Sequence, residues 1–190
     1  MSTDRRKSRG PASIARKEVR FGAVLAGVLV IGLLAWLIFH DGGDSGTQPG
    51  GPESATVESL RETASSSGMP IYWAGPQNGA ELELTNAEGG KRVYVRYLTG
   101  GAQPGDPRPK FLTVGTYVFP DATRALKRQS REVGGELRTA PGGATVYVNP
   151  DRPQSVYLAY PGVEVEIEVY DPSPQRALNL VTAGQIVPVS

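Results

Sequence analysis

A run of 19 residues without a charge, residues 21–39, constrains this 190-residue chain more than any other feature. At ~1.5 Å rise per residue, a helix of that length extends about 28 Å, which is enough to cross the hydrocarbon core of a membrane. A buried core helix is the alternative, but a small domain built from amphipathic segments does not need so long and so apolar an element. The run therefore predicts one transmembrane helix.

The charges on either side of this run predict its orientation. Residues 1–20 carry seven Lys and Arg residues against two acidic ones, whereas the first basic residue after the run is Arg61. Because basic segments stay inside the cell, the N-terminal tail is expected in the cytoplasm and the rest of the chain outside. A cleaved signal peptide is the alternative, but the run is longer than usual and no small-x-small cleavage site follows. We expect a single-pass cell-membrane protein whose first partner is the lipid bilayer.

Residues 40–55 are rich in Gly, Pro and small polar side chains, so they bury little apolar surface and are expected to form a linker. Residues 56–190 remain for one extracytoplasmic domain, since the chain is too short for two domains with separate cores. A short amphipathic helix opens this part, with Val57, Leu60 and Ala64 on one face. Whether that helix packs on the domain is left open by the pattern.

Several chemistries are excluded by composition. The chain has no cysteine, and its one histidine, His40, directly follows the apolar run. The outer domain therefore lacks disulfides, thiolate metal ligands and an imidazole for a catalytic triad or a zinc site. Residues 41–190 hold 13 basic and 17 acidic side chains, which disfavours nucleic acid as a partner. We expect no metal, no cofactor and no catalytic residues.

Beyond Gly68 the apolar residues recur at every second position, which predicts a domain dominated by a sheet. The predicted fold class is α+β, with about seven mostly antiparallel strands and two helices on one face. One helix follows Pro120 and the other follows Pro174. The predicted strands cover residues 69–73, 81–85, 92–98, 111–119, 145–149, 155–160 and 163–170.

Alternation within these strands predicts which charges face outward. Glu81 and Glu83 alternate with leucines, and they are placed to pair across a hairpin with Arg92 and Arg96. Exposed pairs of this kind contribute only ~0.2 to 1 kcal/mol each. Three glutamates at positions 164, 166 and 168 line one face of the last strand, and they too are expected to be solvated.

The segment IYWAGP, residues 71–76, concentrates aromatic side chains between turn-forming residues. Tyr72 and Trp73 would offer flat apolar surfaces with polar tips, which suit sugars, peptides or wall polymers. The alternative is that these residues form the first core strand, because large aromatics in small domains mostly pack inside. We name both as candidate binding residues.

The loop TGGAQPGDPRPKF, residues 99–111, is the longest irregular stretch between the predicted strands. It contains Arg108, and together with Arg96 it would form an anion site, since guanidinium groups bind carboxylates or phosphates through paired donors. The alternative is a solvent-exposed crossover whose charges serve solubility. Arg96 and Arg108 complete the set of candidate binding residues.

Several short motifs resemble a group of single-pass membrane-anchored proteins of actinobacterial type, to which no activity is assigned. They are IYWAGP, ELELT, KRVYVRYLTGG, GDPRPKFLTVGTY, SVYLAYPG and EVYDPSP, and the likeness covers roughly residues 69–182. The resemblance implies the same topology and one continuous domain, and it transfers no ligand or catalytic residue to this chain.

The predicted function is a non-enzymatic binding or interaction module of the cell envelope, whose partner is an envelope protein or a cell-wall component. One alternative is an outer-face hydrolase that uses carboxylates alone, which requires two acidic side chains converging in a deep pocket. The other is a signalling or assembly partner that acts through residues 1–20.

Overall fold

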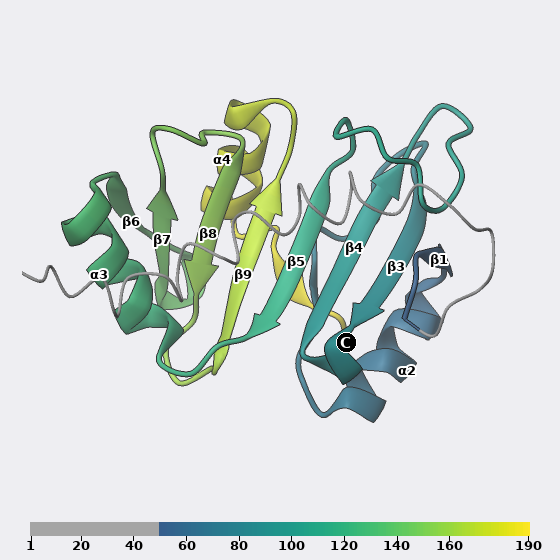
Figure 1. Cartoon of the computed structure of the whole chain (residues 1–190), viewed down its shortest axis with the longest axis horizontal. Helices are drawn as coiled ribbons and strands as arrows, with labels where there is room; N and C mark the ends of the chain where they lie inside the picture. Colours follow the sequence, from purple (N-terminus) through teal and green to yellow (C-terminus); the bar gives the residue numbers. More distant parts are fainter. Residues whose placement is uncertain (1–49) are drawn as a thin grey trace, which may run out of the picture.

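The computed structural model describes residues 50–190, which form one antiparallel sheet of eight strands with three helices on its two faces (Figure 1). The strand order is β1-β3-β4-β5-β9-β8-β7-β6. The α+β class and the mostly antiparallel sheet are as the sequence predicts. The strands are β1 (Glu53–Ala55), β3 (Glu81–Ala87), β4 (Arg92–Leu98), β5 (Thr113–Val118), β6 (Glu136–Ala140), β7 (Ala144–Val148), β8 (Ser155–Ala159) and β9 (Val165–Tyr170).

The cytoplasmic tail, the membrane helix and most of the linker predicted above lie outside the described residues. None of the helices within residues 50–190 is long and apolar enough to cross a membrane. The end of the expected linker is described, and there residues 53–55 form strand β1, which pairs with β3.

Two runs of neighbouring strands meet at the centre of the sheet. The chain passes through β3, β4 and β5, and then crosses through helix α3 (Ala122–Val133) to the far edge. From that edge β6, β7, β8 and β9 return toward the middle, where β9 pairs with β5 along its whole length. A second sheet has two short strands, β2 (Tyr72–Trp73) and β10 (Val187–Pro188).

One face of the large sheet carries the main core. Val95, Val114, Val169 and Val156 lie opposite one another in register across four strands, and all four are completely buried. Helices α2 (Val57–Ser67) and α4 (Pro174–Thr182) contribute apolar residues to the same core. Each fully buried side chain of this size contributes ~1.5 to 3 kcal/mol through the apolar area removed from water.

The helix ends follow local chemistry. Thr56 caps α2 by accepting a hydrogen bond from the Ser59 backbone N–H, and Gly68 ends the helix at a positive φ of 65°. Leu60 of α2 is completely buried, so this helix packs on the domain. Pro174 begins α4, where its missing N–H leaves no hydrogen bond unmade.

The opposite face of the sheet is covered by α3 over only part of its width. Ala122 and Leu126 of α3 pack on Tyr147, Tyr157 and Ala159 of β7 and β8, forming a second cluster separate from the main core. The helices thus lie on both faces, not on one as the sequence predicts, because the crossover after β5 leads α3 over the side opposite α2 and α4 (Figure 1).

Two expectations about exposure are wrong. The pairing of Glu83 with Arg96 in adjacent strands is confirmed, but both side chains are buried, with 1% and 7% of their surfaces exposed. Glu166 and Glu168 are also buried, at 8% and 2% exposed. Alternation separates the two faces of a strand, but it does not say whether the polar face is open to water.

Candidate functional site

A groove of about 310 Å³ lies where the C-terminal end of β4 meets the start of α4. Its walls come from the turn after β2, the end of β4, the loop leading to β5 and the first turn of α4. Because these segments are far apart in the sequence, only the folded domain brings them together. The lining residues are Gln77, Asn78, Ala80, Tyr97, Thr99, Lys110, Phe111, Leu112 and Arg176.

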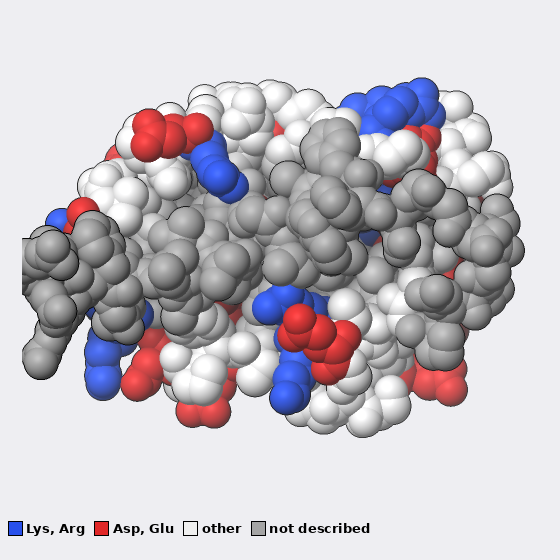
Figure 2. Space-filling view, in the orientation of Figure 1, with Lys and Arg blue, Asp and Glu red and all other residues white. Residues whose placement is uncertain are grey.

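Two cationic side chains reach this groove from different segments. Lys110 Nζ lies 5.2 Å from the centre of the Phe111 ring, and among residues 50–190 it takes part in no salt bridge. Arg176 donates to Asp171 Oδ2 at 2.9 Å and to Gln77 Oε1 at 3.2 Å, while about half of its side chain stays exposed. Figure 2 shows basic side chains gathered at the upper edge of the molecule, over the loop between β4 and β5.

The aromatic segment at residues 71–76 is held beside this groove by hydrogen bonds. The Tyr97 hydroxyl accepts from the Ala74 N–H at 2.8 Å and donates to the Gly75 carbonyl at 3.1 Å. Gln77 Nε2 donates to the Ala74 carbonyl at 2.9 Å. Burial raises the pKa of Tyr97 to about 12, so this hydroxyl keeps its proton at neutral pH.

None of the four candidate binding residues lines the groove. Tyr72 is buried and stacks on Tyr160, with ring centres 5.4 Å apart. Trp73 is half-buried against the main core and pairs with β10. Arg96 is buried, and Arg108 is exposed and paired with the Asp106 carboxylate.

Arg96 and Arg108 act on one loop instead of forming a free anion site. Arg96 donates to Glu83 Oε1 at 2.8 Å and to the Asp106 carbonyl at 2.7 Å, and it lies over the Phe111 ring. The second oxygen of Glu83 accepts from the Gly105 N–H at 2.7 Å. The Glu83–Arg96 ion pair therefore holds the loop between β4 and β5 in place, and this loop positions Lys110 at the groove.

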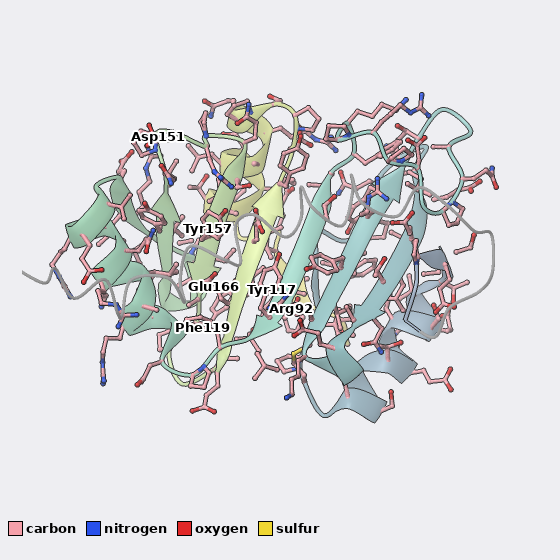
Figure 3. All side chains as sticks on the ribbon, viewed as in Figure 1. Arg92, Tyr117, Phe119, Asp151, Tyr157 and Glu166 are labelled. Carbon is pink, nitrogen blue, oxygen red and sulfur yellow. The ribbon has the colours of Figure 1, made fainter. Side chains whose placement is uncertain are left out.

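A second polar cluster lies near the centre of the sheet, on the same face as Glu83 and Arg96. Glu168 accepts three hydrogen bonds, from Tyr117 at 2.8 Å, from Ser155 at 2.7 Å and from Tyr157 at 3.1 Å. The Tyr117 ring reaches Glu168 by lying across Gly115, where a Cβ would come within 2.5 Å of its hydroxyl. Figure 3 shows Tyr117, Tyr157 and Glu166 projecting from neighbouring strands of this part of the sheet.

The two carboxyl groups of this cluster lie on the same face of β9. Burial, and next the charge of Glu168, raise the pKa of Glu166 from 4.5 to about 7. Burial also raises the pKa of Glu168, although the hydrogen bonds from Ser155, Tyr117 and Tyr157 oppose this. The cavity beside Glu166 has a volume of only about 30 Å³, which holds about one water molecule and no sugar or peptide.

Within the described part of the chain, no group of three or more His, Asp or Glu side chains gathers as metal ligands. Sequence patterns missed Arg176 and Gln77 as groove residues. Both follow prolines at turns, at Pro174 and Pro76, and no local pattern shows that the two turns meet.

Comparison with known proteins adds no functional information, because no family model, no curated protein and no solved structure matches this chain. The function is therefore inferred from the geometry of the groove.

Proposed function

We propose that this chain is a single-pass membrane protein of the cell envelope whose outer domain binds a carboxylate-bearing ligand in the groove, without chemical conversion. The main support for this proposal is that Lys110 and Arg176 line the same groove of about 310 Å³. Lysine and arginine side chains bind carboxylates through charge-assisted hydrogen bonds. The amides of Gln77 and Asn78 add donors and acceptors beside them.

The membrane location rests on the sequence. The basic residues 1–20 and the uncharged residues 21–39 favour an N-terminus in the cytoplasm and a domain outside. In that location the available carboxylates belong to wall peptides or to acidic segments of envelope proteins. Both sources offer the same chemical group, and the experiment below separates them.

A hydrolase that uses carboxylates is less well supported. The groove is lined by no Asp or Glu, and the cavity beside the buried Glu166 is too small for a substrate. Glu168 is also held by tyrosine and serine hydroxyls, which is an arrangement suited to packing. Signalling through residues 1–20 rests on their basic charge, which membrane topology and attraction to anionic lipids already explain.

The test is direct binding by the full-length protein in detergent micelles. Purified wall peptides with free carboxylates, the same peptides with amidated carboxylates, and extracted envelope proteins are titrated separately. We expect the free-carboxylate form of one source to bind. Lys110→Ala should weaken that binding by roughly tenfold or more, because a hydrogen bond to a charged group contributes ~1.5 to 3 kcal/mol.

Lys127→Ala is the matched control, because Lys127 is an exposed lysine on α3 and does not line the groove. It should bind as the parent does. Equal binding of amidated and free peptides, or an unchanged affinity in Lys110→Ala, would contradict the proposal. For the membrane location, reporters fused to the two ends should lie on opposite sides, with the N-terminal one inside; a protected C-terminus would overturn it.

A further inference from the structure

The two edges of the large sheet differ in how well they are protected from pairing. β1 has three residues and follows Pro52, which has no N–H to donate. β6 has five residues, pairs only with β7, and exposes four of its side chains. An unprotected edge offers a row of N–H and C=O groups to another strand. The β6 edge is therefore the open edge of the described domain.

Exposed apolar side chains gather at this edge. Within residues 50–190 only four large hydrophobic side chains are exposed. Two of them, Val133 and Leu137, lie at the β6 edge and are 48% and 40% exposed. Val133 ends α3, and Gly134 and Gly135 lead directly into β6. Leu137 points to the face that α3 covers, since it lies opposite Tyr147.

The charges of β6 lie on its other face. Glu136 and Arg138 are opposite Val148 and Val146, and they bind each other through two hydrogen bonds of 2.7 and 2.8 Å. Both side chains are substantially exposed, at 57% and 40%. An acidic and a basic residue thus flank Leu137 at equal spacing on one side of the open edge.

This spacing makes the strand complementary to itself in one antiparallel register. When Leu137 of one copy lies opposite Leu137 of another, Glu136 of each faces Arg138 of the other. Centring the pair on Arg138 places two arginines opposite each other, and centring it on Glu136 places two glutamates together. Opposite charges across strands stabilise a pair and like charges destabilise it. β1 offers no such register, because its only charge is Glu53.

We propose that β6 pairs with β6 of a second copy of this chain, antiparallel and centred on Leu137, so that two eight-stranded sheets join at a two-fold axis. The pairing adds main-chain hydrogen bonds along the edge and two Glu136–Arg138 pairs on one face. On the other face the two copies of Leu137 meet beside the ends of the two α3 helices. Only residues 136–138 of each β6 strand lie opposite one another in this register, so the interface is small and covalent trapping is the suitable measurement.

The absence of cysteine from the chain makes trapping unambiguous. Leu137→Cys is introduced into the full-length protein in its membrane, and mild oxidation is followed by electrophoresis without reducing agent. Opposed residues of antiparallel strands have Cα atoms about 4.5 to 5.5 Å apart, within the range for a disulfide. Leu137→Cys should therefore give a covalent dimer.

Thr139→Cys is the matched control, because Thr139 is exposed, lies on the same face of β6 and is two residues away. In the proposed register its two copies are separated by about four residues along the strands, roughly 14 Å, which is too far for a disulfide. Equal trapping at both positions, stronger trapping at Thr139→Cys, or a covalent product of another size would overturn the proposal.

Charge exchange tests the pairing itself. Within the Leu137→Cys background, Glu136→Arg and Arg138→Glu should each lower the dimer fraction by roughly three- to tenfold, since like charges then face each other twice. Co-expressing the two variants with tags of different size should restore trapping as a mixed dimer. The double exchange Glu136→Arg with Arg138→Glu should trap like the parent. Trapping that is insensitive to the single changes, or that mixing fails to restore, would contradict the proposal.

Discussion

Two buried glutamates on the same face of the sheet are accommodated in different ways. In β3, Glu83 has a guanidinium partner, Arg96, and a backbone N–H donor, Gly105. In β9, Glu168 accepts hydrogen bonds from three hydroxyl groups, and the charge of Arg152 also favours its ionised form. An ion pair keeps both partners charged, whereas hydroxyl groups compensate a buried carboxylate only in part.

The difference has a consequence for each half of the sheet. The ion pair of β3 and β4 also binds two backbone groups of the loop between β4 and β5, the N–H of Gly105 and the carbonyl of Asp106. The hydroxyl groups that bind Glu168 come from side chains of β5 and β8. We therefore expect removal of a charge to lower the stability of the half around β3 and β4. Stability of the half around β8 and β9 should instead depend on pH.

The largest effect is expected from Arg96→Ala. It leaves Glu83 buried without its counter-charge, and breaking a buried pair in this way typically costs ~3 to 5 kcal/mol of unfolding free energy. Urea or thermal denaturation of the purified protein measures the loss. The double variant Glu83→Leu with Arg96→Met removes both charges and should recover most of the stability. A single variant as stable as the parent would show that the pair is not needed.

The next effect concerns pH. The folded pKa of Glu166 is raised from 4.5 to about 7, so the folded state holds a proton that the unfolded state has released between these values. Stability should therefore fall as pH rises from about 4.5 to 7, by up to ~3 kcal/mol for this group, and vary little with it below pH 4.5. Glu168, whose pKa is also raised, acts in the same direction.

Denaturation midpoints measured across this pH range test the difference between the two halves. Glu166→Gln should flatten the slope, because the side chain no longer titrates. Glu81→Gln, an exposed change in the first half, should leave the slope unaltered. A slope that survives Glu166→Gln would assign the pH dependence to another group.

A smaller effect is expected from Tyr117→Phe, which removes one of the three hydroxyl donors to Glu168 while keeping the ring over Gly115. The loss should be about 0.5 to 1.5 kcal/mol, the usual net contribution of one hydrogen bond, or somewhat more because the acceptor is a carboxyl group. Tyr157→Phe, whose bond to Glu168 is longer at 3.1 Å, should cost less. If both variants lose as much unfolding free energy as Arg96→Ala does, Glu83 and Glu168 do not differ in how they are stabilised.

The smallest effect is expected from Arg108→Ala. This arginine holds the pKa of the Asp106 carboxyl well below its usual range, but its own side chain is 59% exposed. Exposed pairs contribute ~0.2 to 1 kcal/mol, so the variant should melt within a few degrees of the parent. Its contrast with Arg96→Ala shows that burial, and not the loop itself, makes an arginine important for stability. A loss near that of Arg96→Ala would refute this.

All seven predicted strands overlap an observed one, because alternation reports directly on side chains that point to opposite sides of a pleated strand. The first predicted strand, residues 69–73, is observed only at Tyr72–Trp73. It pairs with β10 and does not belong to the large sheet. β6 was missed since it lies at an edge. Its residues Glu136, Leu137 and Arg138 are all exposed, so burial imposes no pattern on them.

The sequence by itself determined the α+β class, the strand periods and the turns, because these depend on neighbouring residues along the chain. Tertiary structure alone decided that Glu168 is buried and Arg176 meets Gln77, since both follow from the order in which strands and turns come together. A polar residue at an alternating position looks the same in the sequence whether it faces water or a neighbouring tyrosine. Burial depends on what covers a face, and that is settled only when the neighbouring strands, loops and helix come together.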